Sequence, residues 1–245
     1  MSGHSKWATI KHKKGAADAK RGQMFTKLIK EISIAARMGG GDPDTNARLR
    51  TAILKAKAAN MPKDNVERAI KKGTGELEGS NYEELVYEGY APGGIAILIE
   101  VLTDNKNRAA AEVRNLLTRS GGTLATSNAV MRLFARKGVI SLDGEKYTED
   151  KVMELALEAG ADDIVDEDGE IVVYTSPDAF EAVLTAINNA GMETDGAEIS
   201  MVPETYVDVE KDAGGKVQKL IDRLEESDDV QNVYHNANIP EDAGE

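Results

Sequence analysis

Four lysines, a histidine and the only tryptophan of the chain lie within the ten residues Ser5–Lys14, which we call the arm. Lysine ammonium groups neutralise the phosphates of nucleic acids, and an indole ring stacks on a base or a ribose. The arm is therefore a candidate for contact with a polyanion. It is an equally good interpretation that Trp7 anchors the arm to the helices expected after it. The residues concerned are Lys6, Trp7, Lys11, His12, Lys13 and Lys14.

The charges of the chain are distributed unevenly, although the net charge of the whole protein is −13. Residues 1–75 contain 17 Lys and Arg but only 6 Asp and Glu, a net charge of +11. Residues 138–245 contain 6 basic and 29 acidic residues, a net charge of −23. This asymmetry predicts one surface that attracts polyanions and another that repels them. The acidic residues 138–245 are also a candidate surface for protein partners.

Three short amphipathic helices are expected after the arm, at about residues 24–37, 46–59 and 62–73. In each of them apolar residues recur every three or four positions and mark one buried face. The helices should form a small bundle whose outward faces carry lysines and arginines, either to bind phosphate or simply to remain solvated. Arm and bundle together give the candidate nucleic-acid-binding residues: Lys6, Trp7, Lys11, His12, Lys13, Lys14, Lys20, Arg21, Lys27, Lys30, Lys55, Lys57, Lys71 and Lys72.

After the bundle the pattern changes to alternating strands and helices. Two strands at 85–90 and 95–102 flank a turn, and a helix at 106–119 and a short strand near Thr123 follow. The next elements are a strand at 131–142, a helix at 148–159, a hairpin of 164–165 and 171–174, a helix at 177–188 and a strand at 198–202. Asp168-Gly169 is a strong signal for the turn of that hairpin. The last elements are a strand at 206–209, a turn at Gly214-Gly215, a helix at 216–226 and a strand at 230–234.

These elements predict an α+β protein in which a three-helix domain precedes two ferredoxin-like α+β domains, one inserted in the other. Residues 1–77 form the basic helical domain with its arm. The order strand–helix–strand–strand–helix–strand over residues 133–201 is that of the ferredoxin-like fold. The segments before and after it lack partners of their own. We therefore expect residues 78–132 and 202–238 to pack together as one discontinuous domain.

The residue types that usually carry catalysis or bind metals are scarce. The chain has no cysteine, and its three histidines are not in a metal-binding spacing such as HExxH. Gly214-Gly215-Lys216 lacks the upstream glycine and the following hydroxyl residue of a phosphate-binding loop. We expect no enzymatic activity, no catalytic residue, no cofactor and no metal. The longest apolar run, Ile95–Ile99, is too short to span a bilayer, and residues 1–14 lack the apolar stretch of a secretory signal. Together with the absence of cysteine, these features predict a cytoplasmic protein.

The sequence also lacks the usual modules that read nucleic-acid sequence. Aromatic residues make up only 4% of the chain, whereas RNA-recognition motifs stack bases on aromatic side chains. No zinc-finger spacing, basic zipper or recognition-helix pattern is present. The residues therefore favour contacts with phosphates rather than the reading of base edges.

Several clusters of residues stand in a distinctive order along the chain. They are Gly3-His4-Ser5-Lys6-Trp7, Ile10, Lys14, Asp18, Arg21-Gly22, Phe25-Thr26-Lys27, Asn60-Met61-Pro62, Glu67 to Gly73, Tyr87-Glu88-Gly89-Tyr90, Pro92-Gly93-Gly94, Leu102 to Arg108 and Glu112-Val113-Arg114. In these clusters the chain resembles the YebC family. The match is densest over residues 1–122, and it departs from the family at Ala125–Arg132, where similar proteins usually have a more glycine-rich stretch.

The resemblance implies a helical N-terminal domain followed by two α+β domains, without enzymatic activity or cofactor. It implies a DNA-binding transcriptional regulator, since family members are commonly described in that way. A mitochondrial relative is a translational activator of cytochrome c oxidase, and bacterial members are linked to ribosomes stalled on proline-rich stretches. The second hypothesis is therefore a ribosome-associated translation factor that contacts rRNA or tRNA. A third is a protein-interaction scaffold that uses the acidic residues 138–245.

Overall fold

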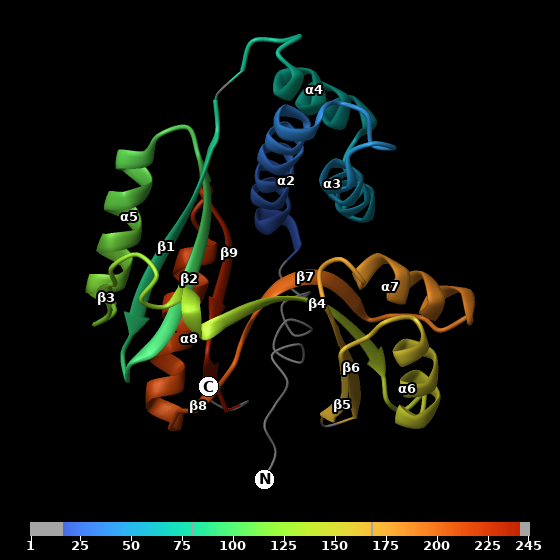
Figure 1. Ribbon diagram of the computed structural model, residues 1–245. Coiled ribbons are helices and arrows are strands. Elements are labelled where there is room, and N and C mark those ends of the chain that lie inside the picture. Colours follow the sequence, from blue (N-terminus) through green and yellow to red (C-terminus); the bar gives the residue numbers. More distant parts are fainter. Residues whose placement is uncertain (1–16, 80, 168, 241–245) are drawn as a thin grey trace. The chain divides into compact units, whose positions relative to one another are not determined.

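The computed structural model describes residues 17–79, 81–167 and 169–240. The chain is an α+β protein in which helices come first and antiparallel sheets follow, as predicted (Figure 1). Contacts between residues divide it into two compact units. Within the described residues, the first unit comprises 17–129 and 216–233, and the second comprises 130–215 and 234–240.

The first unit begins with the expected bundle of three helices. These are α2 (Ala17–Gly39), α3 (Ala47–Ala58) and α4 (Lys63–Thr74). Asn46 fixes the start of α3, because its side-chain oxygen accepts the N–H of Leu49 and its amide donates to the carbonyl of Ala35, 2.8 Å away. The core of the bundle consists mainly of Ile32, Ala35, Ala36, Leu49, Ala52, Ala56, Val66 and Ala69.

A four-stranded sheet with the order β3-β1-β2-β9 follows the bundle. Its strands are β1 (Glu83–Ala91), β2 (Ile95–Thr103), β3 (Thr123–Leu124) and β9 (Val230–His235). The helices of this part are α5 (Lys106–Arg119) and α8 (Lys211–Glu225). The strand β9 thus lies beside β2, although residues 104–229, which include the whole ferredoxin-like arrangement described next, separate the two in sequence.

The second unit contains a ferredoxin-like arrangement, with the strand order β5-β6-β4-β7 and antiparallel pairing throughout. The core on the helical side of this sheet includes Ile140, Val152, Val173, Val183 and Ile187. The elements are β4 (Phe134–Asp143), α6 (Glu149–Glu158), β5 (Asp163–Glu167), β6 (Glu170–Thr175), α7 (Phe180–Asn189) and β7 (Gly196–Pro203). The strand expected from residue 131 begins at Phe134, because Met131–Leu133 form a turn of 3₁₀ helix.

Two expectations for the C-terminal part are wrong. Gly214-Gly215 is not a turn before a helix but lies inside α8, where the N–H of Gly214 bonds the carbonyl of Glu210 at 2.7 Å. The strand expected at 206–209 is β8 (Val207–Asp208), which does not join the first sheet. It pairs in parallel with β10 (Ala237–Asn238), a two-residue strand too short to give a sequence pattern.

Candidate nucleic-acid interface

Helix α4 presents three cations on one exposed face. Arg68, Lys71 and Lys72 are three and four residues apart, a spacing that places side chains next to one another on a helix. Val66 and Ala69 point the other way, into the core of the bundle, and are 8% and 1% exposed. Burial of the apolar residues therefore fixes the direction in which the cations point.

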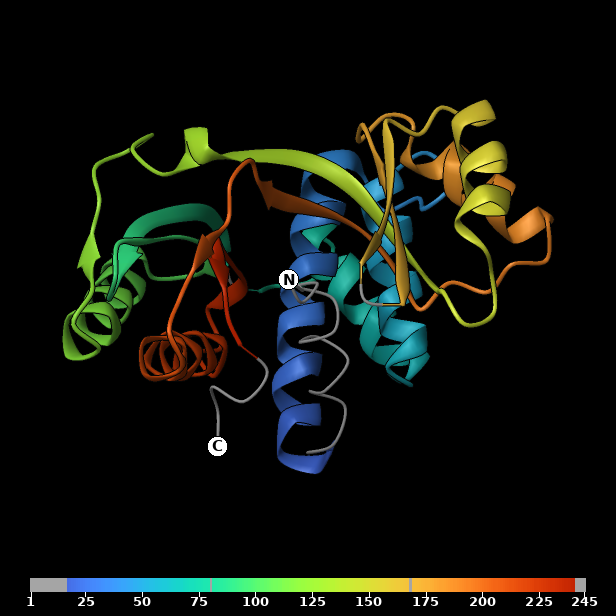
Figure 2. The ribbon, with the colours of Figure 1, turned by 90° about the horizontal axis from the view of Figure 1, so that it is seen from below.

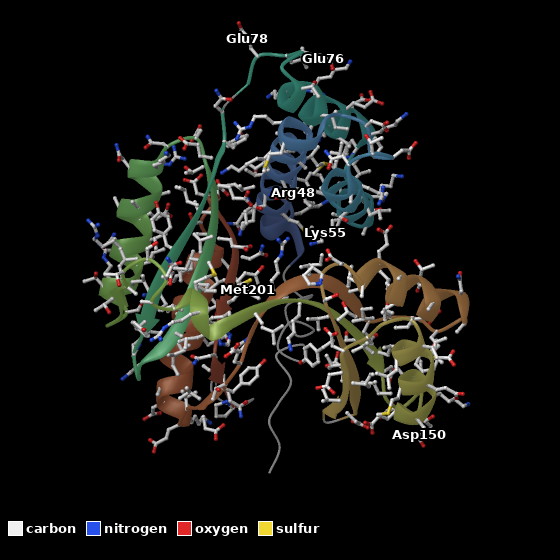
Figure 3. The ribbon with its side chains drawn as sticks, viewed as in Figure 1. Arg48, Lys55, Glu76, Glu78, Asp150 and Met201 are labelled. Carbon is white, nitrogen blue, oxygen red and sulfur yellow. The ribbon has the colours of Figure 1, made fainter. Side chains whose placement is uncertain are left out.

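Helix α3 adds two exposed cations near its C-terminal end. Lys55 and Lys57 lie in its last turn and are exposed, while Leu49, Ala52 and Ala56 pack inward. Figure 3 shows the side chain of Lys55 projecting from this helix. Cations in the last turn also interact favourably with the helix dipole. Such a lysine can therefore stabilise the helix and still offer its ammonium group to a ligand.

Within the described residues, these five cations have neither a hydrogen bond from their side chain nor an ion pair. Lys63, at the start of α4, differs, because its Nζ lies 3.4 Å from a carboxylate oxygen of Glu67. The protein as a whole carries a net charge of −13, so carboxylates are abundant. Cations without carboxylate partners leave the positive potential of each helix available to an external anion. The five residues are Lys55, Lys57, Arg68, Lys71 and Lys72.

Arg48 of α3 does not belong to this set. Its Nε lies 2.7 Å from Glu31 of α2, and its Nη2 lies 2.9 Å from Glu84 of β1 (Figure 3). The hydrogen bonds to Glu31 raise the pKa of Arg48, burial opposes them, and Glu84 adds to the increase. Arg48 thus joins α2, α3 and β1 within the first unit.

The expectation that Lys30 faces outward to bind phosphate is wrong. Lys30 is only 7% exposed, and its Nζ lies 2.8 Å from Asp229 Oδ1. The same ammonium group donates to the carbonyls of Asp228, at 2.7 Å, and Leu102, at 3.3 Å. The side of α2 opposite to the bundle core is covered by the segment between α8 and β9, so Lys30 has no access to a nucleic acid.

Lys27 and Arg21 are the other described candidates on α2. Lys27 is half-buried, and its Nζ donates to the carbonyl of Glu225 at 2.7 Å, so it also helps to hold the end of α8. Arg21 is exposed, and its guanidinium carbon lies 5.5 Å from the centre of the Phe25 ring. The side chain of Lys20 and the six arm residues Lys6, Trp7, Lys11, His12, Lys13 and Lys14 lie outside the described part.

Asp229 is the centre of an ionic cluster in the first unit. It is 4% exposed and accepts hydrogen bonds from Lys30 and from Arg108 of α5, whose Nη2 lies 2.8 Å from Asp229 Oδ2. Burial is the largest single effect on the pKa of Asp229 and raises it. The hydrogen bonds from Lys30 and Arg108 act in the opposite direction, and the pKa of Asp229 is lowered overall from its ordinary value. The bond to Asp229 in turn raises the pKa of Arg108, and Asp104 adds to this effect.

A pocket lies over this cluster, and Tyr82, Glu112 and Glu226 contribute to its walls. The lining contains no cysteine and no histidine, and its Asp229 carboxylate is paired with both Lys30 and Arg108. No three His, Asp or Glu side chains within residues 17–79, 81–167 and 169–240 are grouped so that they could hold a metal ion. The paired charges of this pocket therefore contribute to the stability of the first unit.

Arg68 belongs to this set of cations but is not among the candidates predicted from the sequence. The sequence contains the signal for it, because Arg68 precedes Lys71 and Lys72 by three and four residues, a spacing that predicts a shared helix face. The structure thus places Arg68 beside the predicted residues Lys71 and Lys72 on α4, while the predicted residues Lys55 and Lys57 are exposed on α3. It separates them from Lys30, which is paired in the interior.

The fold and this site define the class of protein: a basic three-helix bundle followed by antiparallel α+β sheets, with no described helix long and apolar enough to cross a membrane. The family model for the TACO1/YebC protein N-terminal domain matches residues 5–76. The model for the TACO1/YebC second and third domain matches residues 82–237. The chain belongs to the TACO1/YebC family, which confirms the resemblance to YebC proteins.

Similar proteins match this chain over nearly their whole length. A relative from Treponema pallidum (strain Nichols) is 67% identical over 98% of each chain, and one from Treponema denticola is 66% identical over the same share. Both carry the name "Probable transcriptional regulatory protein". The crystal structure of the conserved hypothetical protein Aq1575 from Aquifex aeolicus is 47% identical, with a TM-score of 0.85, and covers 97% of this chain and 98% of its own.

Proposed function

We propose that this protein is a non-enzymatic, cytoplasmic regulator of gene expression that binds nucleic acid through its arm and the exposed cations of α3 and α4. The observation that carries the proposal is the set of five exposed cations on these two helices, none of which is paired with a carboxylate of the described chain. Such cations bind phosphates by Coulomb attraction and by the release of counterions. The arm, with four more lysines and Trp7, would extend the same surface.

Double-stranded DNA is the first candidate for the nucleic acid. The names of the relatives from Treponema describe probable transcriptional regulators. A protein that covers DNA through phosphate contacts can regulate transcription with little base-specific contact. On this proposal the arm lysines and the cations of α3 and α4 bind the backbone of the duplex.

A ribosome-associated translation factor that contacts rRNA or tRNA is the alternative, and the outward face of α3 favours it. That face carries Thr51, Leu54 and Ala58, and Leu54 is 58% exposed. Helices that read the major groove instead carry side chains such as Arg, Asn or Gln, which bond base edges. Structured RNA is bound through its shape, its phosphates and its 2′-hydroxyls, which requires no groove-reading helix.

Binding to a duplex DNA and to a structured RNA of equal charge, each measured at several salt concentrations, tests the proposal. We expect at least one of them to bind, and the affinity to fall as salt rises. Changing Lys11, Lys13 and Lys14 to Glu should abolish this binding while the circular dichroism of the chain stays unchanged. Undiminished binding by that variant, or no binding by the unaltered protein, would overturn the proposal.

Crosslinking in cells, followed by sequencing of the recovered DNA and RNA, separates the candidates. Recovery of promoter DNA supports the transcriptional role, and recovery of rRNA or tRNA supports the translational one. Recovery of neither leaves the role of a protein-interaction scaffold, in which the acidic residues 138–245 bind protein partners.

A further inference from the structure

The ferredoxin-like sheet has one face that neither of its own helices covers. Successive residues of a strand point to opposite faces. Ile140 of β4 and Val173 of β6 belong to the core beneath α6 and α7, so Val139 and Val172 point to the other side. Figures 1 and 2 show α6 and α7 on the same side of the strands. We call the opposite side the open face.

The centre of the open face is apolar and well packed. The strand register places Val165, Val172 and Ser141 opposite one another on β5, β6 and β4. Val139 is 1% exposed and Val172 is 0% exposed, although both point away from α6 and α7, so a part of the chain other than these two helices already shields the strip from solvent. An apolar strip of this kind is suited to cover by a further segment of chain that brings apolar side chains of its own.

Carboxylates border this apolar strip. The neighbouring cross-strand row consists of Asp163, Tyr174, Val139 and Glu198, so that a carboxylate stands on each edge strand of the sheet. Lys137 is the cation of this face, and its Nζ lies 5.5 Å from the centre of the Tyr174 ring. The acidic side chains of the open face therefore outnumber its cations. They are Asp143, Asp163, Glu170 and Glu198.

The arm has the complementary chemistry. It contains four lysines and no acidic residue, and Trp7 and Ile10 are its large apolar side chains. Ten extended residues span about 35 Å, which is close to the length of a ten-residue strand such as β4. A single extended pass of the arm could therefore place Trp7 on the valines. Lys11 and Lys13, four and six residues further on, point to the same side as Trp7 and could reach carboxylates such as Asp163 and Glu198.

We propose that the open face of the ferredoxin-like sheet is the docking surface for the chain's own arm, Ser5–Lys14. The docked arm covers Val139 and Val172, and its lysines pair with the carboxylates at the edges of the sheet. Docking neutralises the same lysines that a nucleic acid would bind, so the acidic unit holds the arm when no nucleic acid is present. The docking itself does not depend on the proposed function, and it is testable without nucleic acid.

The fluorescence of Trp7 tests this proposal directly, because Trp7 is the only tryptophan of the chain. Its quenching by acrylamide is measured in the full-length protein and in a peptide of residues 1–16. We expect Trp7 to be protected in the protein, with emission shifted to shorter wavelength, and the protection to be lost in Asp163→Lys/Glu198→Lys. The single variant Asp163→Lys should lose part of the protection of Trp7. Because Asp163 is exposed, this variant remains informative if the double variant fails to fold.

A matched control carries the same change of charge on the helical side of the sheet. Glu154 and Glu158 are exposed on α6, so Glu154→Lys/Glu158→Lys should leave the protection of Trp7 intact. Equal loss of protection in the control, or persistent protection in the face variants, would overturn the proposal. So would quenching of the unaltered protein as strong as that of the peptide, or protection that disappears on dilution, which would mean docking between two copies.

Trapping by a disulfide gives a second measurement. Since the chain contains no cysteine, an engineered pair is the only one that can form. Lys11→Cys with Asp163→Cys should oxidise to an intramolecular disulfide, whereas Lys11→Cys with Glu154→Cys should not. Equal yields from both pairs would contradict docking on the open face.

Discussion

Lys30 Nζ of α2 and Asp229 Oδ1, just before β9, lie 2.8 Å apart, and their side chains are 8% and 5% exposed. The bond joins the N-terminal helix to a segment from near the end of the chain. Arg108 binds the second oxygen of the same carboxylate, so both oxygens of Asp229 are satisfied. A buried carboxylate with two cationic partners makes the stability of the first unit sensitive to the loss of any one charge.

The change Asp229→Ala should destabilise the first unit by about 3–5 kcal/mol, because it leaves the ammonium group of Lys30 buried without a counterion. Urea unfolding followed by circular dichroism measures the loss. Asp228→Ala is the matched control, since that side chain is exposed and only the backbone carbonyl of Asp228 binds Lys30. Equal stability of the two variants would show that the buried pair contributes little.

The stability of the protein should depend on pH through Asp229. Its pKa in the folded protein lies below the ordinary carboxyl value, which is about 3.9 in unfolded chains. The stabilisation is therefore fully present above that value and is lost as the pH falls through the lowered pKa. The difference in unfolding free energy between the unaltered protein and Asp229→Asn should shrink between about pH 5 and pH 2. A difference that does not change over this interval would rule out the assignment.

Local patterns in the sequence predict several elements well, because the signals for a helix lie within it. The pattern predicts a helix at 106–119, and α5 spans Lys106–Arg119, with the Asn105 side chain accepting the N–H of Arg108 as its cap. The three bundle helices and the ferredoxin-like order are confirmed for the same reason. Their apolar positions alone identify the buried faces.

The burial of Lys30 could not be predicted from the helical period. The period identifies the face of α2 that buries apolar residues, and Lys30 lies on the opposite face. That face is covered by Asp228 and Asp229, which are distant in sequence and polar, so no apolar pattern in the sequence indicates the contact.

The turn expected at Gly214-Gly215 is wrong for a different reason, since glycine is typical of turns but these two glycines are helical. They lie in the first part of α8, where Gly214 is buried.

Gly73→Ala should destabilise the bundle by about 1–3 kcal/mol, because the helices α2 and α4 approach closely there. A β-carbon at Gly73 would lie 2.2 Å from the carbonyl oxygen of Ser33. Gly22→Ala is the control, since it lies in α2 with nothing within 4 Å of an added β-carbon. That change should stabilise the helix by about 0.5–1 kcal/mol. Thermal unfolding measures both, and the same sign for the two variants would refute the packing argument.

Removal of the cations of α4 should weaken the binding of nucleic acid. Changing Arg68, Lys71 and Lys72 to Glu is expected to lower the affinity and to reduce the slope of log K against log salt by about 0.7–0.9 for each phosphate that is no longer neutralised. The control changes Lys151, Lys216 and Lys219 to Glu, which alters the net charge equally at exposed positions of α6 and α8. Equal reductions in affinity for the two triple variants would mean that net charge, not the α4 surface, determines the affinity.

The sheet formed by β1, β2 and β9 also constrains the order in which the protein can fold during synthesis. The N–H of Leu102, in β2, donates to the carbonyl of Asp229, which the ribosome adds long after it has completed β2. The ferredoxin-like elements are contiguous and can close as soon as Pro203 has emerged. The edge of β2 must instead wait, unpaired, until β9 arrives, and an unpaired apolar strand is prone to associate with other chains. The nascent chain is therefore most in need of a chaperone in the interval between these two events.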